Sequence, residues 1–120
     1  MSVLQIQTER LKTMFFQSWS IQSSSLWTPE NPAKGQCGVT SLVVHDLLGG
    51  EIRKTMLKEG WHFYNLIDGQ RFDFTESQFA APITYMDLPA TREEAFADTN
   101  AQQYTFLKKR ILDQWCDANH

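Results

Sequence analysis

The feature that most limits the fold of this chain is an aromatic β-hairpin near its middle. Residues 61–67 (WHFYNLI) and 70–75 (QRFDFT) have the composition of β-strands. Between them, Asp68 and Gly69 form the dipeptide that favours a two-residue type I′ turn. A turn of this length fixes the register of the two strands, and register decides which side chains share a face.

This register places His62 and Asp73 on one face of the hairpin, as diagonal cross-strand neighbours. Asp73 can then accept a hydrogen bond from one imidazole nitrogen and fix which nitrogen faces outward. Asp73 can instead cap a strand or pair with Arg71 or Lys58. The opposite face carries mostly apolar side chains, Trp61, Phe63, Asn65, Phe72 and Phe74. We therefore expect the apolar face to pack against the core and the polar face to be available for a functional site.

Helices are expected on either side of the hairpin. Ser2 and Gln5 have capping-box spacing, and the apolar residues that follow recur at helical spacing to about Ser18. A second helix is expected over 36–48, ended by Gly49-Gly50, and an amphipathic last helix is expected to begin near Asn100. The remaining expected segments are a loop over 20–35, a strand over 51–58, a turn at 59–60, a loop over 80–90 and a helical segment capped by Thr91 and Glu94.

The expected fold class is α+β. The N-terminal helix and the cysteine-bearing helix pack on a small three-stranded antiparallel meander, and residues 1–120 form one domain with a C-terminal helix. The last helix carries Tyr104, Leu107, Ile111 and Trp115 on one face, and core packing explains this stripe.

Composition excludes several functions. A net charge of −3 with interspersed signs lacks the basic footprint of a nucleic-acid binder. No apolar run approaches the ~18 residues of a membrane span, and the N-terminus does not resemble a signal peptide. We therefore expect a cytoplasmic protein with reduced thiols. The cysteines and histidines show no CxxC or HxxxH pair, so neither a metal nor another cofactor is expected.

Cys37 is the candidate nucleophile, because it lies in the first turn of the second expected helix. The helix dipole contributes ~0.3–1 kcal/mol to a thiolate there, and a facing imidazolium contributes ~1.5–3 kcal/mol. Together these lower the thiol pKa by about two units if His62 packs against the helix start. Otherwise Cys37 is a small buried hydrophobe. His45 lies ~12 Å along the helix, too far to serve as the base, and Cys116 is expected to be structural.

Oxyanion donors are also needed for acyl transfer. The backbone N–H of Cys37 is one candidate, and the side chains of Gln36, Asn31 or Trp27 are others. Asn31 and Gln36 can alternatively cap the helix or hold the preceding loop. Trp27 belongs to the segment WTPENP, which we expect to form one wall of the site.

Residues 27–52 (WTPENPAKGQCGVTSLVVHDLLGGEI) and 62–79 (HFYNLIDGQRFDFTESQF) resemble the YunG-like family of small bacterial proteins, with the likeness covering roughly Ser18 to Phe79. More distantly, the GQC element and the HxxN followed by DxT resemble papain-like and transglutaminase-like enzymes. That resemblance implies a papain-like fold with Cys37 as nucleophile, His62 as base and Asp73 as orienter.

Two functions are consistent with these patterns. The first is a cysteine hydrolase or acyltransferase acting on an amide, ester or thioester of a peptide or small molecule. The second is a catalytically inactive papain-like module that binds a partner, because 120 residues leave little material for a long substrate cleft.

Overall fold

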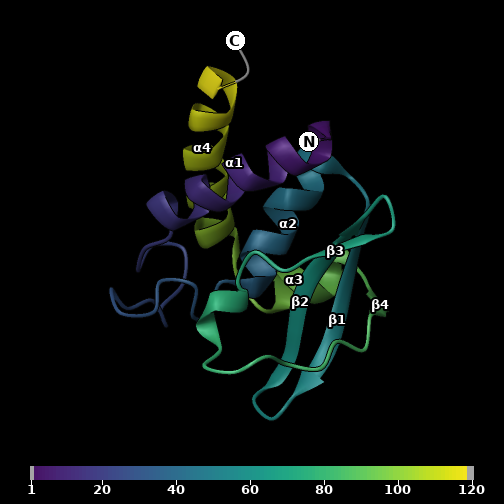
Figure 1. The fold of residues 1–120 in the computed structure, drawn as a ribbon. Coiled ribbons are helices and arrows are strands. Elements are labelled where there is room, and N and C mark those ends of the chain that lie inside the picture. Colours follow the sequence, from purple (N-terminus) through teal and green to yellow (C-terminus); the bar gives the residue numbers. More distant parts are fainter. Residues whose placement is uncertain (1, 119–120) are drawn as a thin grey trace.

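The computed structural model describes residues 2–118, which form an α+β fold (Figure 1). The helices and strands follow in the order α1 (Val3–Ser18), α2 (Cys37–Leu48), β1 (Glu51–Leu57), β2 (Gly60–Ile67), β3 (Gln70–Phe72), the 3₁₀ helix η1 (Glu76–Gln78), β4 (Leu88–Ala90), α3 (Arg92–Ala97) and α4 (Ala101–Ala118).

The predicted hairpin register is confirmed. Ile67 pairs with Gln70, and the two turn residues both have positive φ, 50° at Asp68 and 75° at Gly69, as a type I′ turn requires. The returning strand is shorter than predicted, because β3 ends at Phe72 instead of continuing to Thr75. Asp73 therefore follows the strand and is held by its side chain instead of by ladder bonds.

The sheet has four antiparallel strands in the order β3-β2-β1-β4, instead of the three expected. β4 lies in the stretch expected to be a loop, and its central residue is Pro89. A proline is tolerated in an edge strand, where its missing N–H interrupts no central ladder. β4 is such an edge, pairing only with β1. The β1–β2 turn is Lys58-Glu59, one residue earlier than expected, since Leu57 pairs with Gly60.

The helix boundaries follow the predicted caps. Capping boxes form at Ser2 with Gln5 and at Thr91 with Glu94. α2 ends at Leu48, where Gly49 adopts a φ of 70°. The two capping boxes are strong local signals because each satisfies backbone N–H groups that the first helical turn leaves unpaired.

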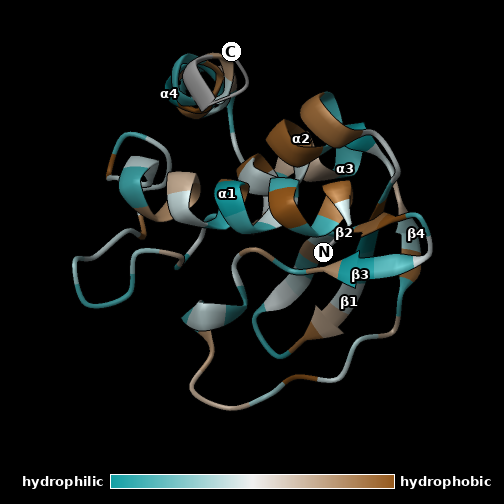
Figure 2. Cartoon of the chain, turned by 45° about the horizontal axis from the view of Figure 1, so that its top comes forward, coloured by the Kyte–Doolittle hydropathy of each residue, from teal (hydrophilic) through white to brown (hydrophobic). Residues whose placement is uncertain are grey.

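α2 is the central helix of the molecule. It contacts β1 and β2 on one side and α3 and α4 on the other, while α1 packs against α4. Figure 2 shows hydrophobic residues along most of α2 and a more mixed pattern on α1 and α4. The larger core cluster joins these helices to the hairpin and has as its most buried members Leu11, Phe15, Ala33, Val39, Val43, Val44, Leu107 and Ile111.

The second face of the sheet is also covered, contrary to the expectation of a polar face open for use. The segment between β3 and β4 crosses in front of β1 and β2 (Figure 1). His62 and Tyr64 point toward this segment and are only 3% and 1% exposed. Phe63 and Asn65, on the other face as expected, are buried toward α2, where Asn65 donates to the carbonyl of Ser41.

Candidate functional site

The imidazole of His62 is bonded to the carboxylate of Asp73, as the hairpin register predicted. His62 Nε2 and Asp73 Oδ2 lie 2.7 Å apart, and each side chain is 3% exposed. Phe79 packs edge-on against the imidazole, with ring centroids 4.9 Å apart. Since Nε2 is engaged by Asp73, Nδ1 is the nitrogen left to exchange a proton with another group.

Asp73 is held in place by three further hydrogen bonds. Its Oδ1 accepts from the backbone N–H and the hydroxyl of Thr75, both at 3.2 Å. Its Oδ2 accepts from the hydroxyl of Tyr85 at 2.8 Å. Burial and this bond to Asp73 raise the pKa of Tyr85 well above its usual value, so the phenol remains a donor at neutral pH. Arg71 pairs with Asp87 instead of Asp73, and no ion pair of the described residues joins Lys58 to Asp73.

Cys37 begins α2 and is 8% exposed. It belongs to a small apolar cluster with Phe63 and Leu42. Because successive side chains of a strand point to opposite faces, Phe63 and His62 leave β2 in opposite directions. Cys37 and His62 nevertheless line the same cavity of about 300 Å³, which lies at the start of β2 beside the N-terminus of α2.

The side chain that forms a hydrogen bond with Cys37 belongs to Asp98, a residue that the sequence analysis did not identify. The Cys37 thiol donates to Asp98 Oδ2 at 3.5 Å, and the Gly38 N–H donates to the same oxygen at 3.1 Å. Within residues 2–118, no hydrogen bond joins Cys37 to His62.

The predicted lowering of the Cys37 pKa is therefore wrong for this conformation. Burial raises the pKa of the thiol far above its usual range, and the negative charge of Asp98 raises it further. Burial also raises the pKa of the Asp98 carboxyl, although its bonds to Cys37 and Gly38 oppose that shift. The helix dipole does not compensate, because the thiol has been removed from water and placed beside a carboxylate.

The three residues proposed as oxyanion donors or as a wall of the site lie in different environments. Asn31 lines the cavity, and its Nδ2 donates to the carbonyl of Gln78 at 3.1 Å. Gln36 is fully buried, both polar atoms of its amide lack a protein partner, and it does not line the cavity. It makes no side-chain cap to α2. Trp27 packs against the larger core instead of forming a wall, and its Nε1 is also buried without a partner.

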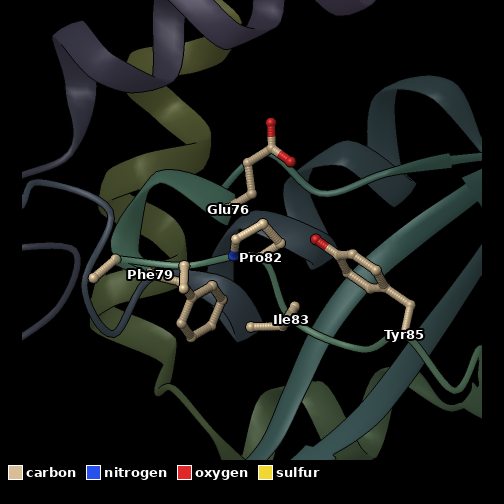
Figure 3. A pocket seen from close by; sticks show the side chains of 7 residues that line it. Glu76, Phe79, Pro82, Ile83 and Tyr85 are labelled. Atoms are coloured by element: carbon tan, nitrogen blue, oxygen red, sulfur yellow. The ribbon is translucent and has the colours of Figure 1, made fainter.

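A second hollow of about 300 Å³ is lined by residues of the segment that covers the sheet, and two of them, Phe79 and Tyr85, contact His62 and Asp73. Figure 3 shows Phe79, Pro82 and Ile83 around it, with Glu76 and Tyr85 at its polar edges. Phe79 lines both this hollow and the cavity of Cys37. Phe79 is therefore shared by two neighbouring spaces.

Sequence reasoning missed Asp98 and Tyr85. Asp98 lies 61 residues after Cys37, and no local pattern links a residue after a short helix to the start of another helix. Tyr85 lies in the proline-bearing loop. The one available signal was that a tyrosine stands there among small and apolar residues.

His45 and Cys116 are not part of the site. His45 lies near the end of α2 and its Nδ1 is 2.8 Å from Arg92. Cys116 is an exposed free thiol on α4 instead of the structural residue expected. Among the described residues, no group of three metal-ligating side chains gathers, and no helix is long and apolar enough to cross a membrane.

Comparison with known proteins identifies the family. The model of the family described as YunG protein matches residues 7–116. The uncharacterized protein YunG of Bacillus subtilis (strain 168) is 55% identical over 101 residues, which cover 84% of this chain and 88% of that protein. No protein of solved structure matches the chain, and these matches give no support to a papain-like relationship. The chain belongs to the YunG family.

Proposed function

We propose that this protein is a small cysteine hydrolase or acyltransferase with Cys37 as nucleophile, His62 as base and Asp73 as orienter. The observation that carries the proposal is that His62, which is bonded to the buried Asp73, lines the same cavity as the thiol at the start of α2. Nucleophile, base and orienter are the three parts of a triad, which is recognised by geometry and roles and not by sequence position.

The proposed reaction has two halves. His62 Nδ1 takes the thiol proton of Cys37, and the sulfur attacks the carbonyl carbon of an amide, ester or thioester. The imidazolium then protonates the leaving amine, alcohol or thiol, and a thioester to Cys37 remains. Water or a second nucleophile attacks this thioester, giving its proton to His62, and the thiol is regenerated. The backbone N–H at the start of α2 and the Asn31 amide are the proposed oxyanion donors.

The proposed substrate is a small molecule or a short peptide segment, because the cavity holds only about 300 Å³. A nucleic-acid substrate conflicts with the net charge of −3. We propose that the fold is a reduced papain-like arrangement, since the cysteine-bearing helix precedes the histidine strand and the aspartate in the chain. A free thiol nucleophile also requires a reducing compartment, and we propose the cytoplasm.

A binding module without catalysis is the second candidate. It is favoured by the hydrogen bond from the Cys37 thiol to Asp98 and by the raised thiol pKa, because a protonated thiol is a poor nucleophile. In this reading the cavity holds a ligand and the His62–Asp73 pair supports its wall.

Acylation by small activated acyl donors distinguishes the two candidates. The protein is incubated with p-nitrophenyl acetate and with an acetyl thioester, and intact mass with peptide mapping locates the acyl group. An enzyme acylates at Cys37 in the wild type and in the Cys116→Ala control, and not in Cys37→Ala. His62→Ala should slow this acylation about 10²–10⁴-fold. Acylation of Cys116 alone, or a rate at Cys37 that His62→Ala leaves unchanged, contradicts the enzyme and favours the binding module.

A further inference from the structure

Asp98 reaches the nucleophile from a different part of the fold. It is the C-cap residue of α3, and it lies at the surface in the turn that leads to α4. Its Oδ2 accepts from both the Cys37 thiol and the Gly38 N–H at the start of α2. One carboxylate oxygen thus occupies the two groups from which acyl chemistry would start.

The contact with Gly38 takes one of the backbone donors that a helix leaves unpaired at its N-terminus. The positive end of the α2 dipole favours a carboxylate here, whereas the C-terminus of α3, which carries Asp98, disfavours one. A developing oxyanion on a substrate bound to Cys37 would use the same end of α2. Asp98 therefore stands where the negative charge of the reaction would form.

The position after Cys37 is shaped to admit this carboxylate. A Cβ atom added to Gly38 would lie 2.5 Å from Asp98 Oδ2 and 2.8 Å from the carbonyl oxygen of Ala95. Only glycine allows α3 and Asp98 to approach α2 this closely. The contact with the thiol is therefore supported by the packing of two helices.

We propose that Asp98 is an internal latch that closes the Cys37 site by holding the thiol proton and the Gly38 N–H until a substrate carbonyl displaces it. This inference rests on the proposed function, because it describes the regulation of the same nucleophile. The latched protein has a protonated thiol. Displacement of Asp98 by an uncharged carbonyl oxygen removes the facing negative charge and frees the Gly38 N–H for the oxyanion.

Other charged groups near the thiol do not replace Asp98. His62 from β2 and Asp73 after β3 approach from the sheet side, and Lys34 and Glu59 line the same cavity. In the described part of the chain, Asp98 makes no ion pair with any of the basic groups, including Lys34. The latch is thus held by two hydrogen bonds to α2 and can be displaced without breaking a salt bridge.

The test is the pH profile of Cys37 alkylation by iodoacetamide, read by peptide mass spectrometry, with Cys116 in the same molecule as reference. Asp98→Asn removes the charge and keeps the shape, and Asp98→Ala removes both. Glu59→Gln is the matched control, because it removes one negative charge from the cavity wall without touching the thiol.

The latch predicts that both Asp98 variants shift the midpoint of Cys37 alkylation to lower pH by one unit or more. For each unit, thiolate rises about tenfold and its intrinsic nucleophilicity falls about threefold, so labelling at pH 7 rises roughly threefold. Glu59→Gln should leave the midpoint within a few tenths of the wild-type value. A midpoint unchanged in both Asp98 variants, or shifted equally by Glu59→Gln, overturns the latch.

This result is separable from that of the acylation experiment. If the Asp98 variants shift the alkylation midpoint but no variant acylates at Cys37, the latch holds and the proposed enzyme fails. If the acylation of Cys37 depends on His62 but the alkylation midpoint is the same in the wild type and the Asp98 variants, the proposed enzyme is supported and the latch is overturned. Circular dichroism of each variant verifies that the fold is retained.

Discussion

His62 Nε2 and Asp73 Oδ2 lie 2.7 Å apart although the strand that should carry Asp73 ends one residue before it. No ladder hydrogen bond fixes the position of Asp73. Thr75 and Tyr85 fix it instead, each by donating to the carboxylate. An imidazole oriented by a carboxylate that is itself held by several donors has a defined tautomer, with the Nε2 proton on the Asp73 side.

Asp73→Asn should reverse the tautomer of His62. Thr75 donates twice at the Oδ1 position and so favours the amide oxygen there, which turns the NH₂ toward the imidazole and toward the hydroxyl of Tyr85. The proton then moves to Nδ1, the nitrogen needed for Cys37. We expect this change in the ¹⁵N chemical shifts of His62, with a loss of about 1–3 kcal/mol in the free energy of unfolding.

Asp87→Asn is the matched control, because Asp87 bonds Tyr64 and Arg71 on the same face of the sheet without contacting His62. It should lower stability and leave the His62 tautomer unchanged. A His62 tautomer that is the same in wild type and Asp73→Asn would mean that Asp73 does not orient the ring.

The hairpin could be predicted because its determinants are local. Asp68 and Gly69 specify the turn, and a two-residue turn specifies the register, so the contact between His62 and Asp73 followed from consecutive residues. The capping boxes are local in the same sense. β4 was missed because a three-residue edge strand has too few residues for an alternating pattern, and its central residue is a proline.

The electrostatic state of Cys37 could not be predicted, because it depends on tertiary packing. The sequence placed the thiol at a helix start, and the dipole there favours a thiolate by less than the burial of the sulfur disfavours it. The burial arises from packing against residues of the sheet and of α3, such as Phe63 and Ala95, and the approach of Asp98 arises from the docking of α3 on α2. The covering of the sheet by the segment after β3 is likewise a long-range property of the fold.

Stability should decline at alkaline pH as Tyr64 ionises. Burial, followed by its hydrogen bond to Asp87, raises the pKa of Tyr64 from 10.0 to about 12. Because the folded state binds this proton more tightly than the unfolded state, the contribution is complete below pH 10 and is lost as pH rises toward 12. Tyr64→Phe should flatten this part of the stability profile, measured by urea unfolding between those two pH values. Equal slopes in both proteins would show that other groups control alkaline unfolding.

Phe79→Ala should join the cavity of Cys37 to the neighbouring hollow. Removing the ring that lines both spaces also uncovers one edge of His62. We expect the labelling rate of Cys37 to increase more for the bulky N-benzylmaleimide than for the small iodoacetamide. The free energy of unfolding should fall by about 1–3 kcal/mol. Ile83→Ala, which enlarges only the hollow in Figure 3, should leave the ratio of the two rates unchanged. A raised ratio in both variants would instead indicate general loosening.

Gly50→Ala should destabilise the fold more than Gly69→Ala does. Both glycines have a φ of 75°, so an alanine at either position is strained by about 1–2 kcal/mol in the left-handed region. An added Cβ at Gly69 meets no atom within 4 Å, whereas at Gly50 it would lie 2.5 Å from the carbonyl oxygen of Leu66. Gly50 lies between α2 and β1 and contacts β2. Relieving this clash therefore moves the cysteine-bearing helix relative to the histidine strand, and we expect it to lower the free energy of unfolding by about 1–3 kcal/mol more than Gly69→Ala does. Chemical unfolding of the two variants measures the difference, and equal losses would mean that α2 and β2 are not held at this distance by Gly50.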